Sequence, residues 1–342
     1  MQVCAKESSQ PVVGETVPPA INPWLARLGL SHVLDDTTHL PCPGSISQWG
    51  SEEPGINDFF LMPEGKGFHL NRKQFNRQLK EEVVAANVEQ LENTSLKALK
   101  EIESGWELQL DNPQGRLTET CQFIVDATGI KSQVARKIGV ARNQFDSVIS
   151  LCALYQLDTT PQKPPYTLLS DSENGWWYGT QLPNQQALIS LCTDRETLLD
   201  NNLGGVENWF KELTVNHWFY QMCCDQFGQT LTYPDSVIPR VAPSSILTRV
   251  VGDNWLCAGD AGSSYDSLTS AGITKAIQQG TIAGEAIVAY LLSGETATLQ
   301  DYQQMVFDDF NSYIRLHRQL HCQGTRFDQS MFWKRRLNAQ FD

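Results

Sequence analysis

Residues 255–262 read WLCAGDAG, an apolar strand that runs directly into a turn of small residues and one aspartate. A further small-residue segment, 266–273 with the sequence DSLTSAGI, stands at the start of a helix that we predict over 270–292. Small residues let the backbone approach a ligand closely, and the free N–H groups of a helix N-terminus attract an electron-rich ligand edge. The pattern indicates a ligand-binding turn in which Asp260 accepts hydrogen bonds from sugar-like hydroxyls. The alternative is an ordinary strand-turn-helix with a solvent-exposed aspartate.

A second predicted strand, far upstream, ends in the same way. Residues 123–132 read FIVDATGIKS, in which an apolar strand precedes an aspartate, small residues and a glycine. One alternative for this segment alone is a purely structural turn. Two such motifs at the carboxyl ends of strands match the edge at which open α/β sheets bind ligands. The sequence therefore predicts an α/β fold with a ligand site between the two turns.

Composition and charge exclude several classes of protein. The chain has 342 residues, 41% hydrophobic and 19% charged, which is enough to bury cores in roughly two domains. Its formal charge of -13 repels phosphate backbones, so nucleic acid is not an expected partner. Apolar runs such as 286–292 are far short of the ~20 residues that cross a bilayer, and no apolar leader follows a basic start. We expect a soluble, cytoplasmic protein with no membrane partner.

The cysteines and histidines give no metal or disulfide pattern. The nine cysteines stand singly or adjacent, without a CxxC pair, so most are expected to be reduced and half-buried. His317 and His321 lie one helical turn apart with Cys322 beside them, but no acidic or CxxC partner is nearby in sequence. We expect no metal site.

Hydrophobic periodicity predicts the helices and strands of the chain and the boundaries of two domains. The return of the strand-turn-helix rhythm after residue 240 predicts a first domain, 1–145 and 240–342, interrupted by a sheet-based substrate domain, 146–239. The pattern predicts a hairpin turn at 111–115, helices over 24–30, 72–88, 206–222 and 302–321, and strands over 1–7, 96–102, 106–110, 121–125, 149–157, 176–182, 187–192 and 254–257.

The two turn motifs, with residues 13–19, 70–72 and 175–178, resemble those of FAD-dependent monooxygenases of the p-hydroxybenzoate hydroxylase and tryptophan halogenase superfamily. The resemblance covers nearly the whole chain. Within that superfamily the chain looks most like the maturation flavoproteins of quinone-cofactor oxidases, such as those serving lysine ε-oxidase and glycine oxidase. The GWWY sequence, the Asp-x-Leu-x-Ser-x-Gly-Ile turn and the tail FWKRR at 332–336 carry this narrower match.

The resemblance implies an FAD-binding Rossmann-like domain with an inserted mixed β-sheet substrate domain. It makes Asp260 the ligand of the flavin ribityl chain, places Gly272 and Ile273 along the isoalloxazine ring, and has Glu7 bind the adenosine ribose. For Glu7 the alternative is an ordinary surface acid. The implied cofactor-binding residues are Glu7, Arg72, Asp126, Thr128, Gly129, Gly259, Asp260, Ala261, Gly272 and Ile273.

The chain departs from the family at its start. The family opens with a strand, GxGxxG and a helix that hold the pyrophosphate, yet no glycine precedes Gly14. Residues 1–7 look like the second strand of that fold, so we expect that about thirty residues of the usual opening, its first βα unit, are missing. A late start site, a truncated gene or a loss of tight FAD binding would each explain this.

The residues of halogenases in this superfamily are also absent. The 39–50 loop contains no lysine, residues 176–183 replace the Trp-x-Trp-x-Ile-Pro motif, and Thr269 stands where halogenases have a glutamate. No Ser-His-Asp, Cys-His or HExxH signature is present either. Halogenation and hydrolysis are therefore not expected, and no catalytic side chain is assigned, because a reduced flavin would itself react with oxygen.

Other conspicuous residues have structural interpretations. His69, beside Phe68, is expected to be a hydrogen-bonded structural residue rather than a proton shuttle. Residues 176–178 either wall a substrate cavity or alternate across a half-buried strand. The basic tail 334–336 is expected to be a solvated terminus, with partner docking as the alternative.

The function implied by the resemblance is FAD-dependent monooxygenation of an aromatic substrate. The narrower match indicates a tryptophan side chain in a precursor oxidase that matures to a quinone-bearing enzyme. A hydroxylase of a small aromatic metabolite is the close alternative, and a non-catalytic remnant or scaffold is the alternative of another class. Electrons would come from a separate flavin reductase or from NAD(P)H.

Overall fold

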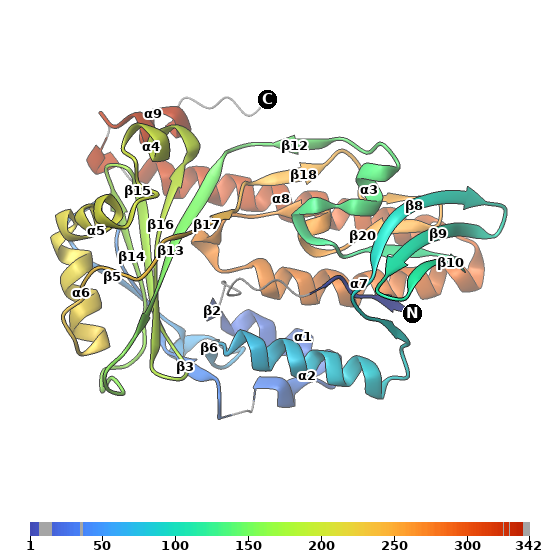
Figure 1. Ribbon diagram of the computed structural model, residues 1–342, viewed down its shortest axis with the longest axis horizontal. Helices are drawn as coiled ribbons and strands as arrows, with labels where there is room; N and C mark the ends of the chain where they lie inside the picture. The colour runs from blue at the N-terminus through green and yellow to red at the C-terminus, as the bar shows by residue number, and fades with distance from the viewer. Residues whose placement is uncertain (7–15, 35–36, 324, 328, 338–342) are drawn as a thin grey trace.

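The computed structural model describes residues 1–6, 16–34, 37–323, 325–327 and 329–337. A large sheet with helices on its outer face lies at one end, a small three-stranded sheet lies at the other, and two long helices run between them (Figure 1). Helices and strands alternate along much of the chain, which confirms the predicted α/β class. Within the described ranges, no helix is long and apolar enough to span a membrane.

The large sheet has seven strands in the order β17-β13-β16-β15-β14-β4-β5. The predicted strands at 149–157, 176–182 and 187–192 are confirmed within it. The sequence pattern did not predict β4 (GSISQ), β5 (GIND) or β14 (TLLSDS), because these segments are too polar to show a strand pattern. The strand bounds are β4 Gly44–Gln48, β5 Gly55–Asp58, β13 Val148–Gln156, β14 Thr167–Ser172, β15 Gly175–Leu182, β16 Gln186–Asp194 and β17 Ile238–Val241.

Strand β15 is buried along its whole length because both faces of the sheet are covered. Successive side chains on a strand point to opposite faces, so the adjacent tryptophans enter different cores. Trp177 packs with Trp209 and Phe219 of the helices on the outer face. Trp176 packs in a second core with Trp333, from the end of the chain. Both tryptophans are core residues rather than cavity walls.

The helices on the outer face correct one prediction. The predicted helix over 206–222 is two helices, α5 (Val206–Val215) and α6 (His217–Phe227). Asn216 breaks it, since its backbone is not helical and its side chain accepts a hydrogen bond from the N–H of Phe219, which caps α6. A short helix, α4 (Arg195–Asp200), follows β16 and is capped by Asp194.

The basic tail forms helix α9 (Met331–Leu337), so the expectation of a solvated terminus is wrong for the described part of it. Trp333 is fully buried, and its indole N–H donates to the carbonyl of Ser172 at 2.8 Å. Arg335 and Arg336 both pair with the buried carboxylate of Asp194 at 2.8 Å. Helix α9 therefore packs against the large sheet as part of the folded protein.

The second layer joins segments from both ends of the chain. Strands β11 (Ile124–Asp126) and β20 (Trp255–Cys257) pair in parallel, so the two predicted turns emerge side by side. The predicted strand at 121–125 is wrong in extent: Cys121 ends β10 of one sheet and Ile124 begins β11 of another. The predicted hairpin turn joins β9 to β10. The strands around this layer are β8 Ser95–Ile102, β9 Gly105–Asn112, β10 Gly115–Cys121 and β19 Val251–Gly252.

Two long helices, α7 (Gly272–Ser293) and α8 (Ala297–Gln323), pack against this layer and bury its main core. The predicted helix over 72–88 is α2 (Arg72–Ala85), capped by Asn71. The other helices are α1 Asn22–Arg27 and α3 Gln133–Lys137, with 3-10 turns η1 Pro19–Ile21, η2 Ser31–Leu34, η3 Phe59–Leu61, η4 Gly129–Lys131, η5 Gly259–Ala261, η6 Ser267–Thr269 and η7 Thr325–Phe327. The remaining strands are β1 Gln2–Val3, β2 Thr16–Val17, β3 Leu40–Cys42, β6 Gly67–His69, β7 Gln90–Leu91, β12 Arg142–Gln144, β18 Ser245–Leu247 and β21 Ser263–Ser264.

The division into an FAD-binding domain and an inserted domain remains a prediction. Segments 1–145 and 240–342 meet in the β11–β20 pair. Strands β4 and β5, however, lie outside 146–239 and still complete the large sheet. That sheet is therefore built from more of the chain than the predicted inserted domain.

Candidate functional site

A cavity of about 720 Å³ lies where the second layer faces the large sheet. One wall is formed by the turns after β11 and β20 and by the starts of α2 and α7, and the opposite wall by β13, β15 and β16. Six predicted cofactor-binding residues line it: Arg72, Gly129, Gly259, Asp260, Gly272 and Ile273.

Three other predicted residues, Asp126, Thr128 and Ala261, are described by the structure and do not line this cavity. Asp126 is fully buried, and its carboxylate accepts N–H groups of Thr128, Val134 and Ala135 at 2.8 to 3.0 Å. It therefore holds the turn and the start of α3. Ala261 is also fully buried, with its carbonyl accepting from Arg142 at 2.6 Å.

The last two predicted residues are Thr128, which the structure describes, and Glu7, which it does not. Thr128 lies in the turn after β11, where its hydroxyl donates to Asp126 at 2.6 Å. Glu7 lies outside the described residues.

Asp260 is held in place by a lysine that the sequence did not indicate. The side chain of Asp260 is 50% exposed, while that of Lys275, on α7, is 4% exposed. The Lys275 ammonium donates to Asp260 Oδ1 at 2.9 Å and to the carbonyl of Ser263, and it lies 4.0 Å from the ring centre of Tyr265. Burial lowers the pKa of Lys275, and Asp260 opposes that shift. A lone lysine in the small, apolar start of α7 was the signal that could have found it.

Backbone geometry explains the small residues of the turn. Gly259 has φ +62°, and a Cβ there would lie 3.3 Å from the Cβ of Ala276. Its N–H donates to the buried Gln279 side chain at 2.9 Å, which ties the turn to α7. A Cβ at Gly272 would meet no atom within 4 Å, so the N-terminus of α7 is open toward the cavity. Glycine there gives a ligand direct access to the positive end of the helix.

The opposite wall carries a chain of hydrogen bonds that leads to His69. Tyr178 and Thr16 line the cavity, and the Tyr178 hydroxyl lies 2.6 Å from Thr16 Oγ1. Thr16 Oγ1 and Thr180 Oγ1 each lie 2.9 Å from His69 Nδ1, and His69 Nε2 donates to the Pro165 carbonyl at 2.7 Å. Burial lowers the pKa of His69 to about 4, which keeps the ring neutral. His69 is therefore a buried, hydrogen-bonded residue as predicted, and it is connected to the cavity.

Comparisons with known proteins show that this fold is shared with flavin-dependent halogenases and monooxygenases of known structure. No family model matches the chain. The chain is 25% identical over 330 residues to the FAD-dependent oxidoreductase LodB of Marinomonas mediterranea. The aligned region covers 96% of this chain and 87% of LodB.

Solved structures show the same fold. The flavin-dependent halogenase CmlS matches with a TM-score of 0.81 at 20% identity, over 99% of this chain, and the chain spans only 63% of CmlS. The peptidyl tryptophan dihydroxylase QhpG, described as essential for tryptophylquinone cofactor biogenesis, matches with a TM-score of 0.75 at 19% identity, over 98% of this chain and 72% of QhpG. The predicted resemblance to this superfamily, and with it the expectation of an FAD-dependent oxidoreductase, is confirmed.

Proposed function

We propose that the chain is an FAD-dependent monooxygenase that hydroxylates an aromatic side chain, specifically a tryptophan of a precursor oxidase during maturation of its quinone cofactor. The observation that carries the proposal is the cavity whose one wall gathers Arg72, Gly129, Gly259, Asp260 and Gly272. The similarity to LodB over almost the whole chain supports the cofactor. The fold shared with QhpG, which acts on a peptidyl tryptophan, motivates the choice of substrate.

The residues on the first wall fit a flavin dinucleotide. Asp260 would accept hydrogen bonds from the ribityl hydroxyls, since its carboxylate is half exposed and is oriented by Lys275. The open N-terminus of α7 at Gly272 and Ile273 would lie along the isoalloxazine ring and favour its anionic reduced form. When bound and reduced, the flavin supplies the activation of dioxygen.

The residues on the second wall would receive and orient the substrate. Cys152, Leu188 and Tyr178 give this wall a largely apolar surface that suits an aromatic ring, and Ser150 and Ser190 add hydroxyls. The Tyr178 hydroxyl would donate to or accept from the substrate, and Thr16, itself hydrogen-bonded to the neutral His69 ring, would hold that hydroxyl in place. The protein would thus contribute orientation and exclusion of water.

The decisive experiment combines cofactor binding with product analysis. The purified chain is titrated with FAD, then supplied with NAD(P)H or a flavin reductase, dioxygen labelled with a heavy isotope, and a tryptophan-containing precursor peptide. The proposal expects saturable FAD binding and incorporation of labelled oxygen into the tryptophan. Oxygen incorporated only into a free aromatic metabolite would favour the alternative substrate class, and absence of FAD binding would favour a non-catalytic scaffold.

A further inference from the structure

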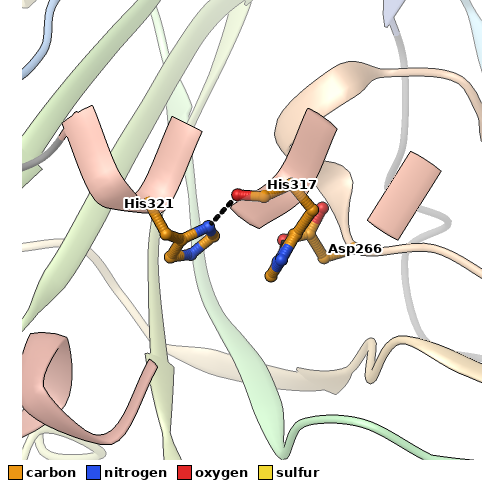
Figure 2. Close-up of side chains that lie close together, drawn as sticks. All are labelled: Asp266, His317 and His321. Atoms are coloured by element: carbon orange, nitrogen blue, oxygen red, sulfur yellow. Dashed lines mark hydrogen bonds and ion pairs between the residues drawn. The ribbon is translucent and has the colours of Figure 1, made fainter. Parts of the chain in front are cut away.

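A compact polar cluster lies behind the cofactor cavity, where helix α8 crosses the loop that precedes α7 (Figure 2). Its members are Asp266, from the loop, and His317 and His321, from one face of α8. One ligand atom from each side chain lies within 4.8 Å of the other two, and all three residues are buried. Histidines at positions i and i+4 share a helix face, which is a common way to present two imidazoles to one metal ion.

The tautomer of His321 leaves a lone pair available. His321 Nδ1 lies 2.8 Å from the carbonyl oxygen of His317, and because a carbonyl only accepts, Nδ1 carries the proton. Nε2 of the neutral ring is then an acceptor, and it is buried without a hydrogen-bond partner among the described residues. An unpaired buried imidazole nitrogen of this kind is a ready metal ligand.

The two other ligand atoms are spaced as a shared ion requires. His317 Nε2 and Asp266 Oδ2 lie 3.0 Å apart. This distance suits a hydrogen bond, and it equally suits two ligands that each lie about 2.0–2.2 Å from one ion. Asp266 is preorganised for this role, since its Oδ1 accepts the N–H of Leu268 and its own N–H donates to the Tyr313 hydroxyl.

A small cavity gives access to the cluster, and an unpaired carboxylate oxygen lies on its wall. A cavity of about 170 Å³ reaches the cluster and is lined by His317, His321 and Asp146. The Oδ2 atom of Asp146 is buried and has no hydrogen-bond partner within the described ranges. Three arginines, Arg318, Arg335 and Arg336, also line this cavity, and Arg335 and Arg336 are paired with Asp194 at 2.8 Å.

We propose that Asp266, His317 and His321 bind a first-row divalent transition-metal ion of the Zn²⁺ type, with the Asp146 side of the cavity open for a fourth ligand. Two imidazoles and one carboxylate are a donor set that such ions prefer. The site was not expected from the sequence, because the acidic partner lies 51 residues before His317 and only the fold brings it near. The ion would anchor the loop before α7, whose other side lines the cofactor cavity.

The test measures metal rather than activity. The flavin-loaded protein is treated with chelator, dialysed and titrated with Zn²⁺, and bound zinc is counted by mass spectrometry of the metal. We expect one tightly bound ion per chain, and a fall in affinity of roughly tenfold or more in His321→Gln and in Asp266→Asn. The matched controls are His32→Gln, an exposed histidine paired with Glu82, and Cys322→Ser, the exposed thiol beside the cluster; both should bind zinc as wild type does.

Either of two results would overturn the proposal. One is wild-type protein without stoichiometric zinc, and the other is unchanged zinc affinity in a folded His321→Gln protein. Should both ligand variants fail to fold, X-ray absorption at the zinc edge of the wild-type protein decides the question. Imidazole nitrogen and oxygen ligands support the site, whereas a sulfur ligand refutes it.

Discussion

Replacing Asp260 by alanine removes a half-exposed carboxylate from the first wall of the cavity. Its Oδ1 atom is held by the Lys275 ammonium at 2.9 Å, and half of the side chain stays accessible to a ligand. A ribityl hydroxyl that donates to this ionised acceptor makes a charge-assisted hydrogen bond, which is worth about 1.5–3 kcal/mol. Because about 1.4 kcal/mol is a tenfold change in affinity, the FAD dissociation constant should rise by roughly 10- to 150-fold.

The variant has a second effect that must be separated from the first. Lys275 is 4% exposed, so removing Asp260 leaves a buried ammonium whose remaining contacts are the Ser263 carbonyl and the Tyr265 ring. A buried charge without its partner destabilises the fold. The double variant Asp260→Ala, Lys275→Met removes both charges, so it should recover unfolding free energy without recovering FAD affinity.

The assay is isothermal titration of the cofactor-free protein with FAD, alongside urea unfolding of the same samples. Asp301→Ala, an exposed acid on α8, carries the same change in net charge and should bind FAD as wild type does. The reasoning fails if Asp260→Ala binds FAD normally, because Asp260 then makes no contact with the cofactor. Recovery of FAD affinity in the double variant would show that the loss came from the unpaired lysine.

Three further outcomes follow from the geometry. Gly259→Ala should lower the unfolding free energy by about 1 kcal/mol and weaken FAD binding, because Gly259 has φ +62° and a Cβ would press on Ala276; unchanged urea midpoints would contradict this. Burial lowers the pKa of His69 from 6.5 to about 4, so between these pH values the unfolded chain carries a proton on His69 that the folded chain does not. The unfolding free energy should therefore fall as the pH drops from about 6.5 to about 4. His69→Gln should make the unfolding free energy, measured by urea unfolding, depend less on pH in this range. Asp194→Asn leaves the buried Arg336 without its carboxylate and should cost about 3–5 kcal/mol, measured by urea unfolding against Asp301→Ala.

Six of the ten residues predicted to bind the cofactor line the cavity, because the signal that marks them is local, while their binding of FAD stays a prediction. The small residues at 259–262 and 272 follow a strand and precede a helix, and the same chain segment supplies the turn, the aspartate and the helix N-terminus. The strands of the large sheet with apolar side chains were also visible. The polar strands β4 and β14 were not, since only pairing with their neighbours makes GSISQ and TLLSDS strands.

Residues whose role depends on distant contacts could not be assigned from sequence. Asp126 follows a strand just as Asp260 does, yet its carboxylate is occupied by backbone N–H groups of α3, and no local pattern distinguishes the two uses. Lys275 is a lone charge in an apolar stretch whose partner is fifteen residues away. The path from Tyr178 through Thr16 to His69 joins three segments that only the packed fold brings together.

The loop between β20 and α7 connects the two proposed sites. Asp260, Asp266 and Gly272 all line the larger cavity, and the Asp266 carboxylate also contacts His317 on α8 at 3.0 Å. A metal ion on Asp266 would restrict the backbone from which α7 begins, and in the proposed binding mode that helix start would lie along the flavin. Two ligands that favour the same arrangement of one loop increase each other's affinity by the same factor. The position of Asp266 therefore makes this loop the element through which occupancy of the histidine cluster would tune cofactor binding.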